Sequence, residues 1–65
     1  MKRYWFELLG KGYEDLGAAI PDGWQKQPAI REAKAWMKEN GIREATLAVN
    51  SMATDNVLAL IDITI

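Results

Sequence analysis

The chain has 65 residues, of which 49% are hydrophobic and 26% charged, and its net charge is −1. These values are those of one ordinary globular domain. Cysteine and histidine are both absent, which excludes disulfides, thiolate metal sites and the commonest general base. A chain this short buries only about 60% of its unfolded surface. Because disulfides are absent, we expect a partner subunit to supply additional burial.

The N-terminal third of the chain has the pattern of a β-hairpin. Arg3–Leu9 alternates its side chains between two faces and is rich in aromatic residues, which predicts a strand. Gly10–Gly12 interrupts this pattern and predicts a turn. Tyr13–Ile20 ends in alternating apolar residues, so we predict a short returning strand there. Its glycine and alanines lower the strand propensity, which is typical of a strand at the edge of a sheet.

One helix is predicted in the middle of the chain. Pro28 suits the first helical position, and Asn40 with Gly41 forms a stop signal in which Gly41 adopts the left-handed conformation. Glu32 in the first turn and Lys38 in the last turn would both favour the helix dipole. Apolar residues recur at helical spacing and form one face, namely Ala29, Ile30, Ala33, Trp36 and Met37.

Two more strands are predicted after the helix. Glu44–Asn50 alternates in the manner of a strand, and the polar segment Ser51–Asn56 connects it to Val57–Ile65. The last strand is rich in β-branched residues and is apolar on both of its faces. A strand of this kind needs cover on both faces, so we expect it at the centre of the sheet.

The expected fold is therefore α+β. Residues 1–65 would form a single ββαββ domain, with a four-stranded sheet and one helix packed on one face. A helix of about 20 Å spans roughly the length of a strand, so the second and third strands would run parallel, as would the first and fourth. We predict the strand order 2-1-4-3, numbered along the chain.

This arrangement leaves the other face of the sheet without a helix. Its apolar residues would be Trp5, Leu9, Ala48, Leu58 and Leu60. A large aromatic residue beside leucines, within a polar border, is typical of an interface. We therefore expect a small protein-interaction domain that forms a homodimer through this face. Alternatively, the predicted second strand or the Trp24 loop covers the face, or Trp24 lines a pocket for a small ligand.

A nucleic-acid-associated accessory role is another alternative. Arg31, Lys34 and Lys38 follow one flank of the predicted helix, and a row of cations of this kind can contact phosphates. Glu32 and Glu39 lie on the same helix, and the chain is net acidic. These features favour an ordinary solvated helix surface over nucleic-acid binding.

No combination of residues predicts catalysis, so we expect no enzyme activity, cofactor or metal. Gly10–Gly12 lacks the spacing of a phosphate-binding loop, and Glu14, Asp15 and Asp22 lack the spacing of a calcium loop. Asp62 is the best acid–base candidate, although a simpler interpretation is that it pairs with Arg3 or Lys2 or lies at the polar border of the apolar patch. The pattern of an export signal or a membrane-spanning helix is missing, so we expect a cytoplasmic protein.

Overall fold

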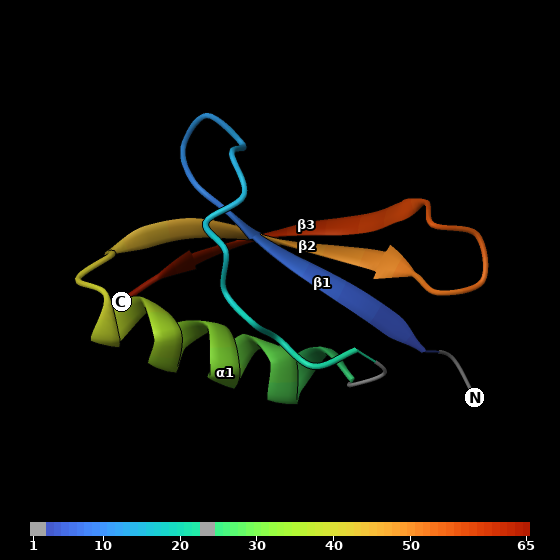
Figure 1. The fold of residues 1–65 in the computed structure, drawn as a ribbon, viewed down its shortest axis with the longest axis horizontal. Coiled ribbons are helices and arrows are strands. Elements are labelled where there is room, and N and C mark those ends of the chain that lie inside the picture. Colours follow the sequence, from blue (N-terminus) through green and yellow to red (C-terminus); the bar gives the residue numbers. More distant parts are fainter. Residues whose placement is uncertain (1–2, 23–24) are drawn as a thin grey trace.

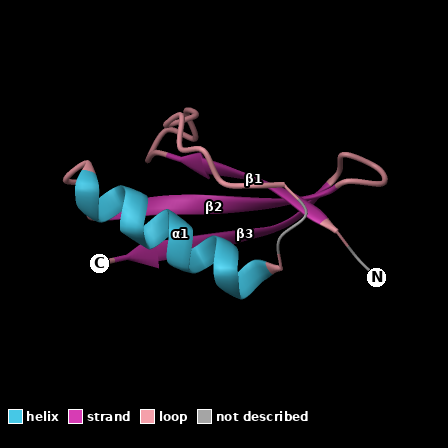
Figure 2. Cartoon of the chain, turned by 60° about the horizontal axis from the view of Figure 1, so that its bottom comes forward, coloured by secondary structure: helices cyan, strands magenta, loops and turns pink. Residues whose placement is uncertain are grey.

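The computed structural model describes residues 3–22 and 25–65, and within them one helix packs on one face of a three-stranded sheet (Figures 1 and 2). The elements are β1 (Tyr4–Leu9), α1 (Lys26–Glu39), β2 (Glu44–Ser51) and β3 (Val57–Thr64). The strands have the order β1-β2-β3, and both neighbouring pairs are antiparallel. The α+β class is therefore correct, but the predicted four-stranded ββαββ sheet with the order 2-1-4-3 and parallel neighbours is wrong.

The predicted second strand does not form. Residues 13–20 make a single isolated bridge to the end of β1, and nearby the Leu16 N–H donates to the Leu8 carbonyl at 2.9 Å. Gly17 has a φ of +80°, which takes the backbone out of the extended conformation that a continuous ladder requires. The alternating apolar residues nevertheless pack against the core, and these are Leu16, Ala18 and Ile20.

The central strand is β2 and not the last strand of the chain. All residues of β2 from Leu47 to Asn50 are at most 2% exposed, whereas Leu58 and Leu60 on β3 are each 53% exposed. A short turn makes β2 and β3 a hairpin, and β1 occupies the other edge of β2. The apolar character of β3 on both faces was misleading, because one of those faces stays open.

α1 lies across one face of the sheet (Figure 2), and the hydrophobic core fills the space between them. Facing pairs from β1 and β2 form its floor, with Phe6 opposite Val49 and Leu8 opposite Leu47. Ala29 and Ala33 are fully buried on α1, and their small size allows the helix to approach the strands closely. The buried cluster consists of Phe6, Leu8, Ile20, Ala29, Ala33, Met37, Ala45, Leu47, Val49 and Ile63.

The N-terminal end of α1 differs from the prediction. The helix begins at Lys26, so Pro28 is its third residue and Glu32 falls in the second turn. The first turn contains no acidic residue, and the predicted interaction of Glu32 with the helix dipole is therefore wrong. The described ranges contain no helix that is both long and apolar enough to cross a membrane.

The C-terminal end of α1 confirms the predicted stop signal. Gly41 has a φ of +68°, and its N–H donates to the Lys38 carbonyl at 3.4 Å. The Ile42 N–H donates to the Met37 carbonyl at 2.9 Å. These two bonds form a Schellman motif, which satisfies carbonyl groups at the helix end and directs the chain into β2.

We predict that Gly41→Ala lowers the free energy of unfolding by about 1 kcal/mol, because an alanine is strained at positive φ. No atom lies near the position of the added Cβ, so backbone strain is the whole effect. Gly41→Asn is the matched control and should lose less, because asparagine tolerates the left-handed region. Urea unfolding measures both variants. Equal losses in the two variants would contradict this account.

Candidate interaction surface

The face of the sheet opposite α1, hereafter the helix-free face, carries every second residue of the three strands. Side chains alternate between the two faces of a strand, and the residues between the core positions must therefore point away from the helix. These residues are Trp5, Glu7 and Leu9 on β1, Thr46, Ala48 and Asn50 on β2, and Leu58, Leu60, Asp62 and Thr64 on β3.

All five residues of the predicted interface lie on the helix-free face, namely Trp5, Leu9, Ala48, Leu58 and Leu60. The register places Leu60 opposite Ala48, and Ala48 opposite Glu7. Membership of this face depends on alternation within each strand and not on the order of the strands. The five residues therefore share one face although the predicted strand order is wrong.

The five residues differ greatly in how much solvent they meet. Leu58 and Leu60 are each 53% exposed, and Val57 beside them is 60% exposed. Trp5 and Leu9 are half-buried, whereas Ala48 is almost completely buried. The accessible apolar surface is therefore concentrated on β3, and Ala48 forms the floor between β3 and Trp5.

A buried polar residue lies at the centre of the helix-free face. Asn50 is only 1% exposed, and its Nδ2 donates to Glu7 Oε1 at 3.3 Å. Trp5 lies directly opposite Asn50 in the register, and its indole Nε1 is buried without an acceptor among the described residues. Slipping β2 by one residue would push Asn50 into the apolar core, so this residue helps to specify the register.

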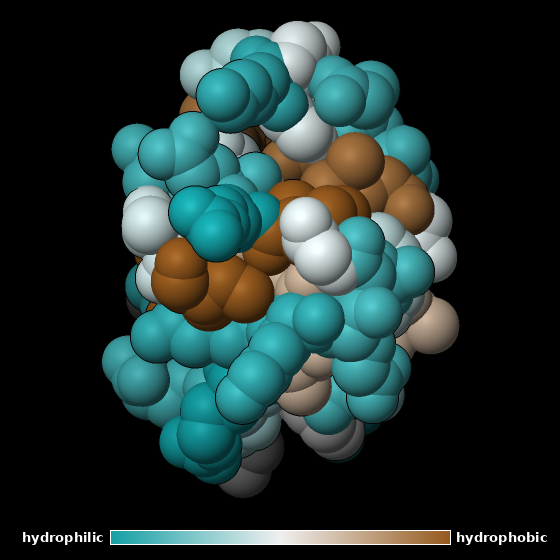
Figure 3. Space-filling model, turned by 90° about the vertical axis from the view of Figure 1, so that its left-hand side faces the viewer, coloured by the Kyte–Doolittle hydropathy of each residue, from teal (hydrophilic) through white to brown (hydrophobic). Residues whose placement is uncertain are grey.

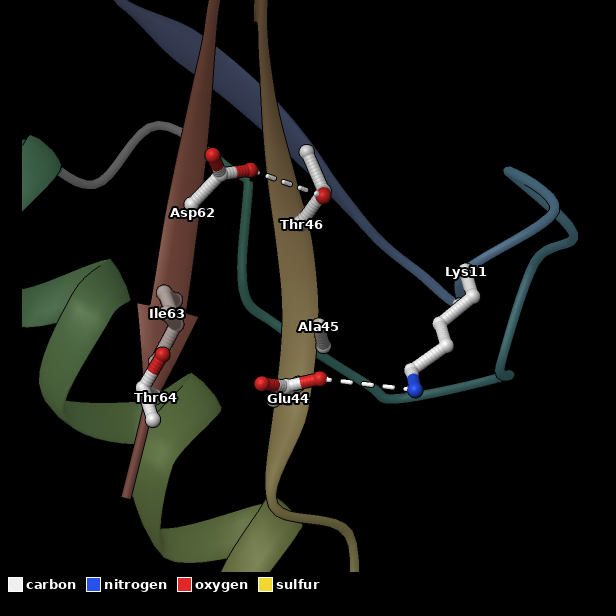
Figure 4. A pocket seen from close by; sticks show the side chains of 8 residues that line it. Lys11, Glu44, Ala45, Thr46, Asp62, Ile63 and Thr64 are labelled. Carbon is white, nitrogen blue, oxygen red and sulfur yellow. Dashed lines mark hydrogen bonds and ion pairs between the residues drawn. The ribbon is translucent and has the colours of Figure 1, made fainter.

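The apolar part of the face ends in polar side chains (Figure 4). The Thr46 hydroxyl donates to Asp62 Oδ1 at 3.2 Å across the β2–β3 pair. Lys11 Nζ reaches from the loop after β1 to within 3.5 Å of Glu44 Oε2, and both side chains are largely exposed. Such an exposed ion pair contributes little stability. Asp62 therefore has a local partner, as a border residue would.

These polar residues border a hollow of about 300 Å³ at the end of the sheet, shown in Figure 4. The part of the chain that the structure describes contains no group of three or more acidic, cysteine or histidine side chains that could hold a metal ion. A second hollow, of about 650 Å³, lies at the opposite end of the sheet. Its lining residues are Arg3, Tyr4, Ser51, Met52, Ala53, Thr54 and Leu58.

The cations that could contact phosphates lie apart from this face. Arg31, Lys34 and Lys38 are all exposed on α1, and the buried side of the helix faces the sheet. Viewed from the end where α1 finishes, hydrophobic atoms form patches that hydrophilic side chains surround (Figure 3). The predictions about Trp24 and Lys2 fall outside the described residues.

We predict that Asn50→Asp lowers the free energy of unfolding at neutral pH by about 2 kcal/mol, because it buries a charge beside the Glu7 carboxylate and removes the donor. Asn56→Asp makes the same chemical change at an exposed position. This control should change the stability by less than about 0.5 kcal/mol. Urea unfolding compares the two, and a similar small loss in both would contradict the structural role of Asn50.

Comparison with models of protein families, with curated proteins and with solved structures finds no match to this chain. Among the features described above, the helix-free face combines the largest exposed apolar side chains of the sheet with a defined polar border.

Proposed function

We propose that this protein is a small non-catalytic assembly domain that binds a second copy of itself through the helix-free face. The observation that carries the proposal is the exposure of Leu58 and Leu60, each 53%, beside the half-buried Trp5. Large apolar side chains grouped inside a polar border are typical of interfaces. In a symmetric dimer the same patch contributes from both subunits, so each leucine is used twice.

The magnitude of this burial limits how tight the contact is. Completely burying one leucine contributes about 1.5–3 kcal/mol, so burying the exposed half contributes about 1 kcal/mol. Four such leucines contribute about 4 kcal/mol in a dimer, whereas a micromolar dissociation constant requires about 8 kcal/mol. Trp5 and Val57 add further area, but the leucines alone support only a weak dimer. A tight assembly needs additional contacts.

The alternative use of Arg31, Lys34 and Lys38 as phosphate contacts has less support. These residues are exposed without a groove that includes them among the described hollows. Glu32 and Glu39 add negative charge to the same helix, and the net charge is −1. A nucleic-acid complex would weaken steeply as salt increases, which an electrophoretic shift at two salt concentrations would reveal.

We predict that Leu58→Lys combined with Leu60→Lys halves the molar mass of the assembly. The lysines of the two subunits would repel each other across the face, and the buried apolar surface of the leucines would be lost. Size-exclusion chromatography with light scattering at micromolar to millimolar concentration measures this mass.

The matched control combines Tyr13→Lys with Met52→Lys. These residues are 64% and 45% exposed but lie in loops outside the helix-free face, so their replacement should leave the mass unchanged. The proposal fails if the wild-type chain is a monomer throughout, or if the face variant keeps the wild-type mass.

A further inference from the structure

The outer edge of β3 is the free edge of the sheet. β2 pairs with β3 on one side only, and the described residues place no strand on the other side. The opposite edge of the sheet is partly covered, because the Leu16 N–H donates to the Leu8 carbonyl of β1 at 2.9 Å. The backbone groups of β3 that point away from β2 therefore have no strand beside them among the described residues.

The register identifies the residues whose backbone groups point outward. The Ile65 N–H donates to the Arg43 carbonyl at 3.0 Å, which extends the β2–β3 ladder by one pair. Hydrogen-bonded and non-hydrogen-bonded pairs alternate along an antiparallel ladder, so Ile61 and Ile63 also bond to β2. The outward groups consequently belong to the intervening residues Leu60, Asp62 and Thr64.

This edge lacks the features that commonly prevent strands from pairing. Natural edge strands are often protected by lysine, proline or several inward charges. β3 contains neither lysine nor proline, and Asp62 is its one charged residue. The register irregularity opposite Val49 and Asn50 lies at the start of the strand, which leaves the rest of the edge regular.

We propose that the β3 edge pairs in antiparallel orientation with β3 of a second copy, around a two-fold axis at Ile61. The outward backbone groups belong to even-numbered residues, so an even-numbered residue must pair with an even-numbered residue of the second copy. The two-fold axis then passes through a residue and not between two residues, and the axes near the middle of the strand are at residues 60, 61 and 62. An axis at 62 sets Asp62 against its own copy, which is unfavourable. An axis at 60 leaves the end of the strand unpaired.

The axis at Ile61 makes the regular part of the edge self-complementary over residues 59–63. On the side of the helix, Ala59 meets Ile63 of the second copy, and Ile61 meets its own copy. On the helix-free face, Leu60 meets Asp62. Every pair on the helix side is therefore apolar, and each of them adds cross-strand packing to the backbone hydrogen bonds.

The product is a continuous six-stranded sheet with both helices on one side. Its two helix-free faces lie next to each other and form one surface with twice as many exposed leucines. If the face contact proposed above also forms, two such sheets pack into a tetramer. Only this last step rests on the proposed function, and the pairing of β3 edges stands without it.

Single cysteines test the pairing cleanly because the chain has none of its own. In Ile61→Cys the two Cα atoms lie about 4.5 Å apart in a non-hydrogen-bonded pair, near the distance that a disulfide spans. In Ala59→Cys, a matched change on the same strand face, the two sites lie about 13 Å apart. Under mild oxidation we expect at least tenfold faster formation of covalent dimer for Ile61→Cys.

Denaturant should abolish this difference between the two variants. Equal rates in native conditions, or no covalent dimer from Ile61→Cys at millimolar concentration, would overturn the proposal. A dimer held only by the helix-free face does not link position 61, because that side chain lies on the helix side of the sheet. Trp5→Lys changes the helix-free face on β1 and adds no lysine to the β3 edge. This variant should still form the covalent dimer when Ile61→Cys is added, so the two contacts can fail separately.

Hydrogen exchange of the wild-type chain provides a second readout. Paired edges should slow the exchange of the Leu60 and Asp62 amides at least tenfold as the concentration rises into the range of assembly. The Ile61 and Ile63 amides bond to β2 in either state and serve as internal controls. Fast exchange of the Leu60 and Asp62 amides in the assembled protein would contradict the pairing.

Discussion

The burial of β2 on both faces and along both edges is the constraint on which the rest of the structure depends. Its core face carries Leu47 and Val49 beneath α1, and its other face carries Ala48 and Asn50 between the side chains of the neighbouring strands. β1 and β3 can pair with this strand only in the observed register, because a slip of one residue exchanges the buried asparagine for core residues.

Protection of the centre leaves the periphery of a small domain exposed. A single helix covers one face of the sheet, and the segment after β1 packs beside that strand. The helix covers one face of β3, and of the described strands only β2 pairs with it, although six of its eight residues are apolar. A chain of 65 residues has few segments with which to cover both the helix-free face and the β3 edge. Both proposed contacts would cover the surface that remains exposed.

Local patterns predicted local features well. Alternation assigned Trp5, Leu58 and Leu60 to one face, and the Asn40–Gly41 signal located the end of the helix. The start of α1 was less predictable, because Pro28 is tolerated throughout the first turn. The alternation of Leu16, Ala18 and Ile20 suggested a strand, whereas an extended segment without a ladder buries the same side chains equally well.

The sequence by itself determined which residues share a face, where the helix ends, and that the chain belongs to the α+β class. These properties depend on alternation and on φ preferences, which act over a few residues. Only the tertiary structure decided that there are three described strands, that β2 is central and that β3 is the open edge. Strand order depends on competition among distant segments for the same edge of the sheet. An apolar strand has the same sequence pattern whether its second face packs inside the chain or against a partner.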